Sequence, residues 1–84
     1  MELHVRLEGE GLHPSEAMVA VETVDGARPL VVSKKSIVQN YIEVGLIREQ
    51  GDKLLVELPR ETESGQWRVW VRRDQVRNRE SILA

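Results

Sequence analysis

The residues best suited to chemistry in this chain lie in one short segment, Trp67-Arg68-Val69-Trp70-Val71-Arg72-Arg73. This segment holds both tryptophans and three arginines of a protein in which only 4% of the residues are aromatic. Indole rings stack on nucleobases and guanidinium groups pair with phosphates, so this composition is typical of a nucleic-acid-binding surface. The same residue types also anchor an ordinary β-strand in a small core. The segment therefore predicts a strand and leaves two roles open for it.

Strand geometry divides the two tryptophans between opposite faces. Because alternate side chains of a strand point to opposite sides, Trp67 shares one face with two valines, and Trp70 shares the other with Arg68 and Arg72. We expect Trp67 to be a core anchor. An exposed Trp70 can stack a base or accept a proline-rich or acidic peptide; alternatively, the arginine stems cover its ring.

Further cations extend the predicted basic surface. Arg73 ends the segment, Arg77 and Arg79 follow it, and Lys34-Lys35 can join the patch if their turn lies near the last strand. The alternative is a solvated tail and an ordinary exposed turn. The candidate ligand-binding residues are accordingly Arg68, Trp70, Arg72, Arg73, Lys34 and Lys35.

Residue patterns for catalysis are sparse. The two histidines, His4 and His13, lie at no spacing typical of a metal site or a catalytic triad. Glu8 and Glu10 can gather a cation with His13 only if a rigid element fixes their loop, and the sequence predicts none. The chain has no cysteine and no dinucleotide, phosphate-loop or nucleophile-elbow motif. We therefore expect no catalytic residues, no metal, no cofactor and no enzymatic activity.

Length and composition indicate one small domain. The chain has 84 residues, 40% hydrophobic and 31% charged, which suffices for a single modest core of Val, Leu and Ile. We expect the domain to span residues 1–76 and residues 77–84 to form a polar tail, frayed or briefly helical. With no cysteine, no signal-like N-terminus and no long apolar run, we expect a cytoplasmic protein that does not bind membranes.

The net charge of -2 conceals an asymmetry along the chain. Residues 1–27 contain six acids and one base, whereas residues 28–84 contain eleven bases and eight acids. A nucleic acid would have to bind a local patch, because the chain as a whole repels polyanions at long range.

Alternating apolar residues and turn-forming dipeptides predict six short strands. Asp25-Gly26 predicts a tight hairpin turn, Ser33 or Ser36 can cap one short helical turn near residues 34–40, and Gly45 indicates a bulge or bend. We expect Leu3, Val5 and Leu7 to face the core together. The expected strands cover residues 2–7, 16–24, 30–33, 42–49 (Ile42, Val44 and Leu46 on one face), 53–58 (Leu54, Val56 and Leu58 inward) and 67–73.

These expectations combine into a fold and a function class. The fold is mainly β: a small, strongly bent antiparallel sheet or a partly open SH3-like or OB-like barrel of five to six strands. Open sheet edges favour a non-enzymatic interaction module that binds a protein partner or forms a homodimer. The alternative is a nucleic-acid-binding small β-barrel that uses the Arg/Trp strand face.

Overall fold

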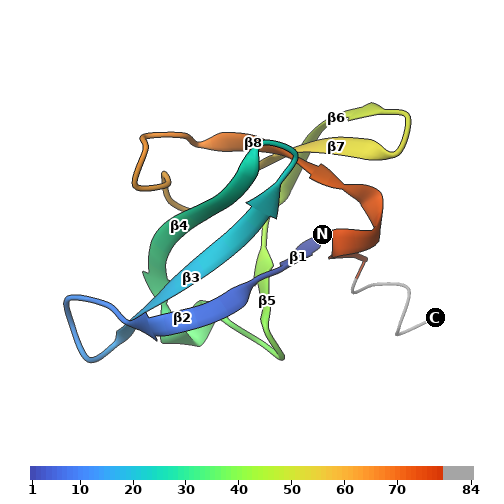
Figure 1. Ribbon diagram of the computed structural model, residues 1–84. Coiled ribbons are helices and arrows are strands. Elements are labelled where there is room, and N and C mark those ends of the chain that lie inside the picture. The colour runs from blue at the N-terminus through green and yellow to red at the C-terminus, as the bar shows by residue number, and fades with distance from the viewer. Residues whose placement is uncertain (79–84) are drawn as a thin grey trace.

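The computed structural model describes residues 1–78 as three small antiparallel sheets with two short 3₁₀ turns and no α-helix (Figure 1). The first sheet has the order β5 (Tyr41–Glu43), β1 (Glu2–His4), β9 (Val76–Arg77). The second contains β2 (Arg6–Glu10), β3 (Glu16–Thr23) and β4 (Gly26–Ser33), and the third β6 (Gly45–Gln50), β7 (Lys53–Glu57) and β8 (Arg68–Arg72). The 3₁₀ turns are η1 (Lys34–Ser36) and η2 (Arg73–Gln75). The prediction of a mainly β domain is confirmed, and the sheets of residues 1–78 do not close into a barrel.

Two buried valines carry the chain from one sheet into the next. Val5 separates β1 from β2 and is 2% exposed, and Val44 separates β5 from β6 and is 5% exposed. Their amides donate hydrogen bonds to the carbonyls of Asn40 (2.8 Å) and Met1 (2.9 Å). The predicted strands 2–7 and 42–49 are therefore each divided at a bend, and β2 continues to Glu10, where a loop was expected. The predicted irregularity at Gly45 corresponds to the second bend, which a β-bulge follows.

The core draws on all three sheets. The predicted inward residues Leu54, Val56 and Leu58 are buried. Leu7 and Leu46, predicted to face the core, are instead 59% and 42% exposed, because the chain has already bent away from the first sheet at Val5 and Val44. The core cluster consists of Leu3, Val5, Val19, Val21, Leu30, Val32, Ile42, Val44, Leu54, Val56, Leu58, Val69 and Val71.

The β3–β4 hairpin forms where Asp25-Gly26 predicts it, with a shifted corner. Thr23 pairs with Gly26, so Val24 and Asp25 make the corner and Gly26 carries a φ of 109°. A glycine with positive φ after the corner lets β4 begin at once, four residues before the expected start at Leu30.

The segment between β4 and β5 is helical only in its first part. Ser33 accepts the Lys35 amide at its Oγ (3.3 Å) and starts η1, as one of the two predicted caps. The chain then reverses between Val38 and Tyr41, whose amides and carbonyls pair with each other. The two intervening residues, 39 and 40, have φ values of 55° and 67°. The helical turn expected near residues 34–40 is thus a 3₁₀ turn followed by a tight hairpin, which requires two left-handed residues in succession.

A charged cluster fixes β9 to β1. The Glu2 carboxylate is 3% exposed and accepts a hydrogen bond from Arg77 Nε at 2.9 Å. The Arg77 guanidinium lies 3.8 Å from the centre of the Tyr41 ring, which His4 meets edge-on. Arg77, expected in the tail, therefore pairs within the first sheet, and the rest of the predicted tail, residues 79–84, lies outside the described residues.

Removal of the Arg77 side chain should destabilise the fold. We expect Arg77→Leu to lower the free energy of unfolding by about 2 kcal/mol, because it takes a charged partner from a buried carboxylate. Arg72→Leu breaks an exposed pair with Asp74 and should cost less than about 1 kcal/mol. Urea unfolding followed by circular dichroism measures both, and equal losses would show that Glu2 does not depend on Arg77.

Candidate ligand-binding surface

The register of the third sheet gathers three predicted site residues on its outer face. Arg68, Trp70 and Arg72 alternate with the buried Val69 and Val71 of β8, as strand parity predicts. On this outer face, residues paired across β6, β7 and β8 form three neighbouring rows: Gly45–Glu57–Arg68, Arg48–Leu55–Trp70 and Gln50–Lys53–Arg72.

The outer face is strongly basic for an acidic chain. Its cations are Arg48, Lys53, Arg68 and Arg72, and its single acid is Glu57. Arg68 Nε pairs with Glu57 Oε1 at 3.2 Å, and Arg72 Nε pairs with Oδ1 of Asp74 in η2 at 3.1 Å. Within residues 1–78, Arg48 and Lys53 have no ion-pair partner. Two cations are thus immediately available to an anion, and two more are held by exposed ion pairs, which contribute little free energy and exchange readily.

Trp70 lies half-buried at the centre of this face. It is opposite Leu55, and its carbonyl accepts the Val24 amide at 3.0 Å, which ties the tip of the β3–β4 hairpin to β8. Leu55 and Trp70 therefore make a small apolar centre surrounded by cations. A half-buried ring is suited to contact a side chain laid against it and offers less area than a free stacking platform.

Trp67 is not the core anchor that its parity suggests. It is 51% exposed, although its carbonyl still accepts the Leu58 amide at 2.8 Å. β8 begins one residue later, so Trp67 overhangs the end of the core and lines an open groove with Leu30 and Val31.

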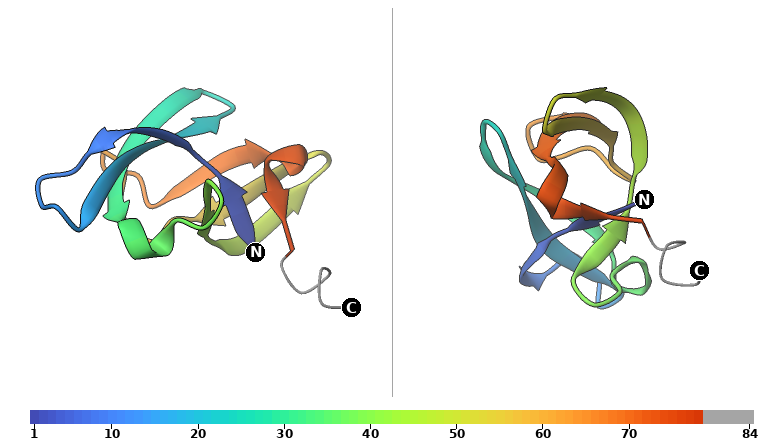
Figure 2. Two further views of the ribbon diagram at one scale, coloured as in Figure 1. Left: turned by 90° about the horizontal axis from the view of Figure 1, so that it is seen from below. Right: turned by 90° about the vertical axis from the view of Figure 1, so that its right-hand side faces the viewer.

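The other three predicted site residues do not join the outer face. Arg73 begins η2 and pairs with Glu49 (3.2 Å) and the Gly51 carbonyl (3.0 Å). Glu49 pairs across the strands with the buried Leu54 and does not belong to the outer face, so Arg73 is held by the end of the β6–β7 hairpin. Lys34 and Lys35 lie on η1, and Figures 1 and 2 show η1 on the opposite side of the molecule from the β6–β7 turn.

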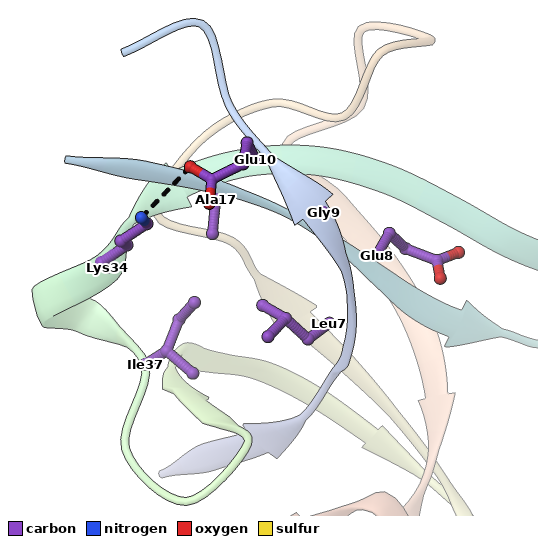
Figure 3. A pocket seen from close by; sticks show the side chains of 7 residues that line it. All are labelled: Leu7, Glu8, Gly9, Glu10, Ala17, Lys34 and Ile37. Atoms are coloured by element: carbon purple, nitrogen blue, oxygen red, sulfur yellow. Dashed lines mark hydrogen bonds and ion pairs between the residues drawn. The ribbon is translucent and has the colours of Figure 1, made fainter. Parts of the chain in front are cut away.

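Lys34 belongs to a different feature, a cavity of about 570 Å³ between β2 and η1. Figure 3 shows Leu7 and Ile37 facing each other across this cavity and the Lys34–Glu10 ion pair, 3.2 Å long, at its rim. The partner of Lys34 is thus a carboxylate of the protein itself, whereas the side chain of Lys35 is exposed and has no ion-pair partner among residues 1–78.

Sequence reasoning missed two members of the outer face for different reasons. Lys53 could have been found, because the same alternation that directs Leu54 inward directs Lys53 outward. Arg48 could not, since regular alternation from Val44 places it on the inner side. The bulge between Leu46 and Arg48 reverses that parity.

The titratable side chains of the described residues form no metal-binding group. Within residues 1–78, no three His, Asp or Glu side chains are grouped to hold a metal ion. Hydrogen bonds to Glu8, and next to Glu22, raise the pKa of Arg6 above its ordinary value, so this exposed guanidinium stays a cation. No helix in the described part of the chain is long and apolar enough to cross a membrane.

Comparisons of the chain with protein-family models, with curated proteins and with solved structures found no match.

The two tryptophans should differ in solvent access. We expect Trp70→Phe, which retains the half-exposed Trp67, to emit at longer wavelength and to be quenched more strongly by acrylamide than Trp67→Phe. The emission maximum and the acrylamide quenching constant are measured for both variants. The urea-unfolded forms give the values for a fully exposed tryptophan. A Trp67 as shielded as Trp70 would contradict the overhanging position.

Proposed function

We propose that this chain is a small, non-enzymatic, SH3-like interaction module that binds an acidic segment of a partner protein on the outer face of β6–β7–β8. The SH3-like arrangement is supported by residues 68–77. There β8 is followed by the 3₁₀ turn η2 and by the short strand β9, which pairs with the N-terminal β1. It is also supported by the strand bent at Val44, whose halves belong to two sheets.

One observation carries the functional proposal: four cations surround an apolar centre on a single sheet face. The whole chain has 12 bases and 14 acids, whereas this face has four bases and one acid. Acidic side chains of a peptide can pair with Arg48 and Lys53, while its apolar side chains contact Leu55 and Trp70. Complementary charge of this kind raises association rates and specificity.

A peptide fits this face better than a second copy joined along the β6 edge. The middle of β6 carries a bulge and the outward Arg48, and both discourage edge-to-edge strand pairing. Two copies paired about Arg48 would also bring like charges together.

Single-stranded nucleic acid is the second candidate ligand. The position of Trp70 between Arg68 and Arg72, with Arg48 opposite Leu55, favours it. The peptide is preferred because only two of the four cations are unpaired and the net charge of -2 opposes a long polyanion.

Binding of an acidic peptide should depend on the unpaired cations of the face. The probe is a fluorescein-labelled decapeptide of alternating glutamate and valine, read by fluorescence anisotropy at low salt. We expect Arg48→Glu to weaken its binding about threefold to tenfold (about 0.7–1.4 kcal/mol), because the change replaces an attraction by a repulsion. Added salt should weaken binding as well.

Lys35→Glu is the matched control, since it makes the same charge change at an exposed, unpaired cation on η1. An equal loss in this variant would reveal a net-charge effect and contradict the site. Equal binding of a glutamine version of the peptide would contradict acidic recognition. Tighter, Arg48-dependent binding of a labelled oligothymidine would replace the peptide by the second candidate.

A further inference from the structure

A second surface with the opposite charge lies beside Trp67. The half-exposed indole lines a groove of about 520 Å³ between β4 and the loop that joins β7 to β8. The groove is distinct from the outer face of β6–β7–β8, with which it shares no residue. Its lining residues are Leu30, Val31, Pro59, Arg60, Glu61, Thr62, Glu63 and Trp67.

The loop wall of this groove is held in place by its own hydrogen bonds. Thr62 is 3% exposed, and its amide donates to the Gln66 carbonyl at 2.8 Å. The Gln66 amide in turn donates to Thr62 Oγ1 at 3.1 Å. Anchoring of Thr62 leaves its two neighbours, Glu61 and Glu63, exposed on the groove wall.

Both ends of the groove are attached to neighbouring strands. At one end the Glu63 amide donates to the Pro29 carbonyl of β4 at 2.9 Å. At the other end Arg60 Nη1 pairs at 3.2 Å with Glu16 of β3, whose side chain is only 14% exposed. The groove is therefore a preformed feature of the fold.

The charge of the groove is negative. Arg60 is balanced by Glu16, whereas Glu61 and Glu63 have no ion-pair partner among residues 1–78. Arg28 approaches from the neighbouring side, but its guanidinium donates to Gln66 Oε1 and the Ala27 carbonyl. Two carboxylates next to an exposed indole attract a cation, which an indole face also binds through its π electrons.

The β4 edge adds backbone groups to the same groove. The Pro29 carbonyl points away from β3, since Glu63 reaches it, and residues two apart on a strand share that direction. The amide and carbonyl of Val31 therefore point to the open edge, where no other described segment pairs with them. An extended peptide can add to a sheet through such groups.

We propose that this groove binds an arginine or lysine of an extended segment of a partner protein, which pairs with Val31 and lays its cationic side chain between Trp67 and the carboxylates of Glu61 and Glu63. A residue opposite Val31 projects on the same face as the Val31 side chain, which lines the groove. The proposal stands independently of the acidic ligand of the outer face.

The test uses a fluorescein-labelled pentapeptide of threonine and valine around a central arginine, and an identical peptide with citrulline, which keeps the shape without the charge. We expect the arginine peptide to bind about fivefold to tenfold more tightly in anisotropy titrations. Methylation of the backbone nitrogen of the arginine should also weaken binding, because it removes the N–H that donates to the Val31 carbonyl. In the Trp70→Phe protein, the unlabelled arginine peptide should change the Trp67 emission.

The Glu61→Gln/Glu63→Gln variant should lose most of the preference for arginine over citrulline. Asp25→Asn/Asp52→Asn is its matched control, because it neutralises two exposed acids that are unpaired within residues 1–78 and should retain that preference. Urea unfolding verifies that each variant is folded. Equal binding of the two peptides, or equal losses in the two variants, would overturn the proposal. A dimer in sedimentation that shields Trp67 would do so as well, since a second copy would then occupy the groove.

Discussion

Burial of Val5 and Val44 at two bends is the constraint on which the rest of the structure depends. The chain has no phenylalanine, and neither its tryptophans nor its tyrosine belongs to the core cluster, so the core is made of thirteen Val, Leu and Ile residues brought together from three sheets. The bends achieve this because β1 and β5 lie side by side and each continues into a different sheet. The amides of both valines donate to carbonyls next to the first sheet, those of Asn40 in the turn before β5 and of Met1 before β1, so neither bend carries an unpaired buried amide.

The same bends account for part of the exposed surface. Beyond them, β2 and β6 are edge strands whose side chains are exposed. Independently of the bends, β8 begins one residue after Trp67 and leaves that indole half-exposed. A small core shared by three sheets thus leaves apolar side chains at its margin, where polar loops and ion pairs surround them. Both proposed binding surfaces lie at such margins. The outer face of β6–β7–β8 is built on strands, which hold its side chains at fixed spacing, whereas the groove beside Trp67 is formed by β4 and the hydrogen-bonded loop between β7 and β8.

Strand existence and side-chain parity could be predicted from the sequence, whereas interruptions of parity could not. The alternation in residues 53–58 and 68–72 gave the correct buried faces, and it set Arg68, Trp70 and Arg72 together. It failed at Arg48, where the bulge reverses the alternation, and it gave the side of Leu46 but not its exposure, because bulges and bends are decided by packing against distant strands. It also failed for Trp67, which precedes the first residue of β8 and is 51% exposed. β9 was missed because a two-residue strand has no period, and its pairing depends on Glu2 at the other end of the chain.

The low net charge of this chain, -2, conceals two surfaces of opposite local charge. The outer face of β6–β7–β8 has an excess of cations, and the groove beside Trp67 has two unpaired carboxylates. Screening in physiological salt reduces interactions beyond about 8 Å, so each surface attracts ligands by its local charge and not by the net charge. Each surface combines that charge with one tryptophan, half-buried on the basic face and half-exposed in the acidic groove. The two proposed ligands carry opposite charges and address surfaces that share no residue, so the proposals imply that they do not compete for one site.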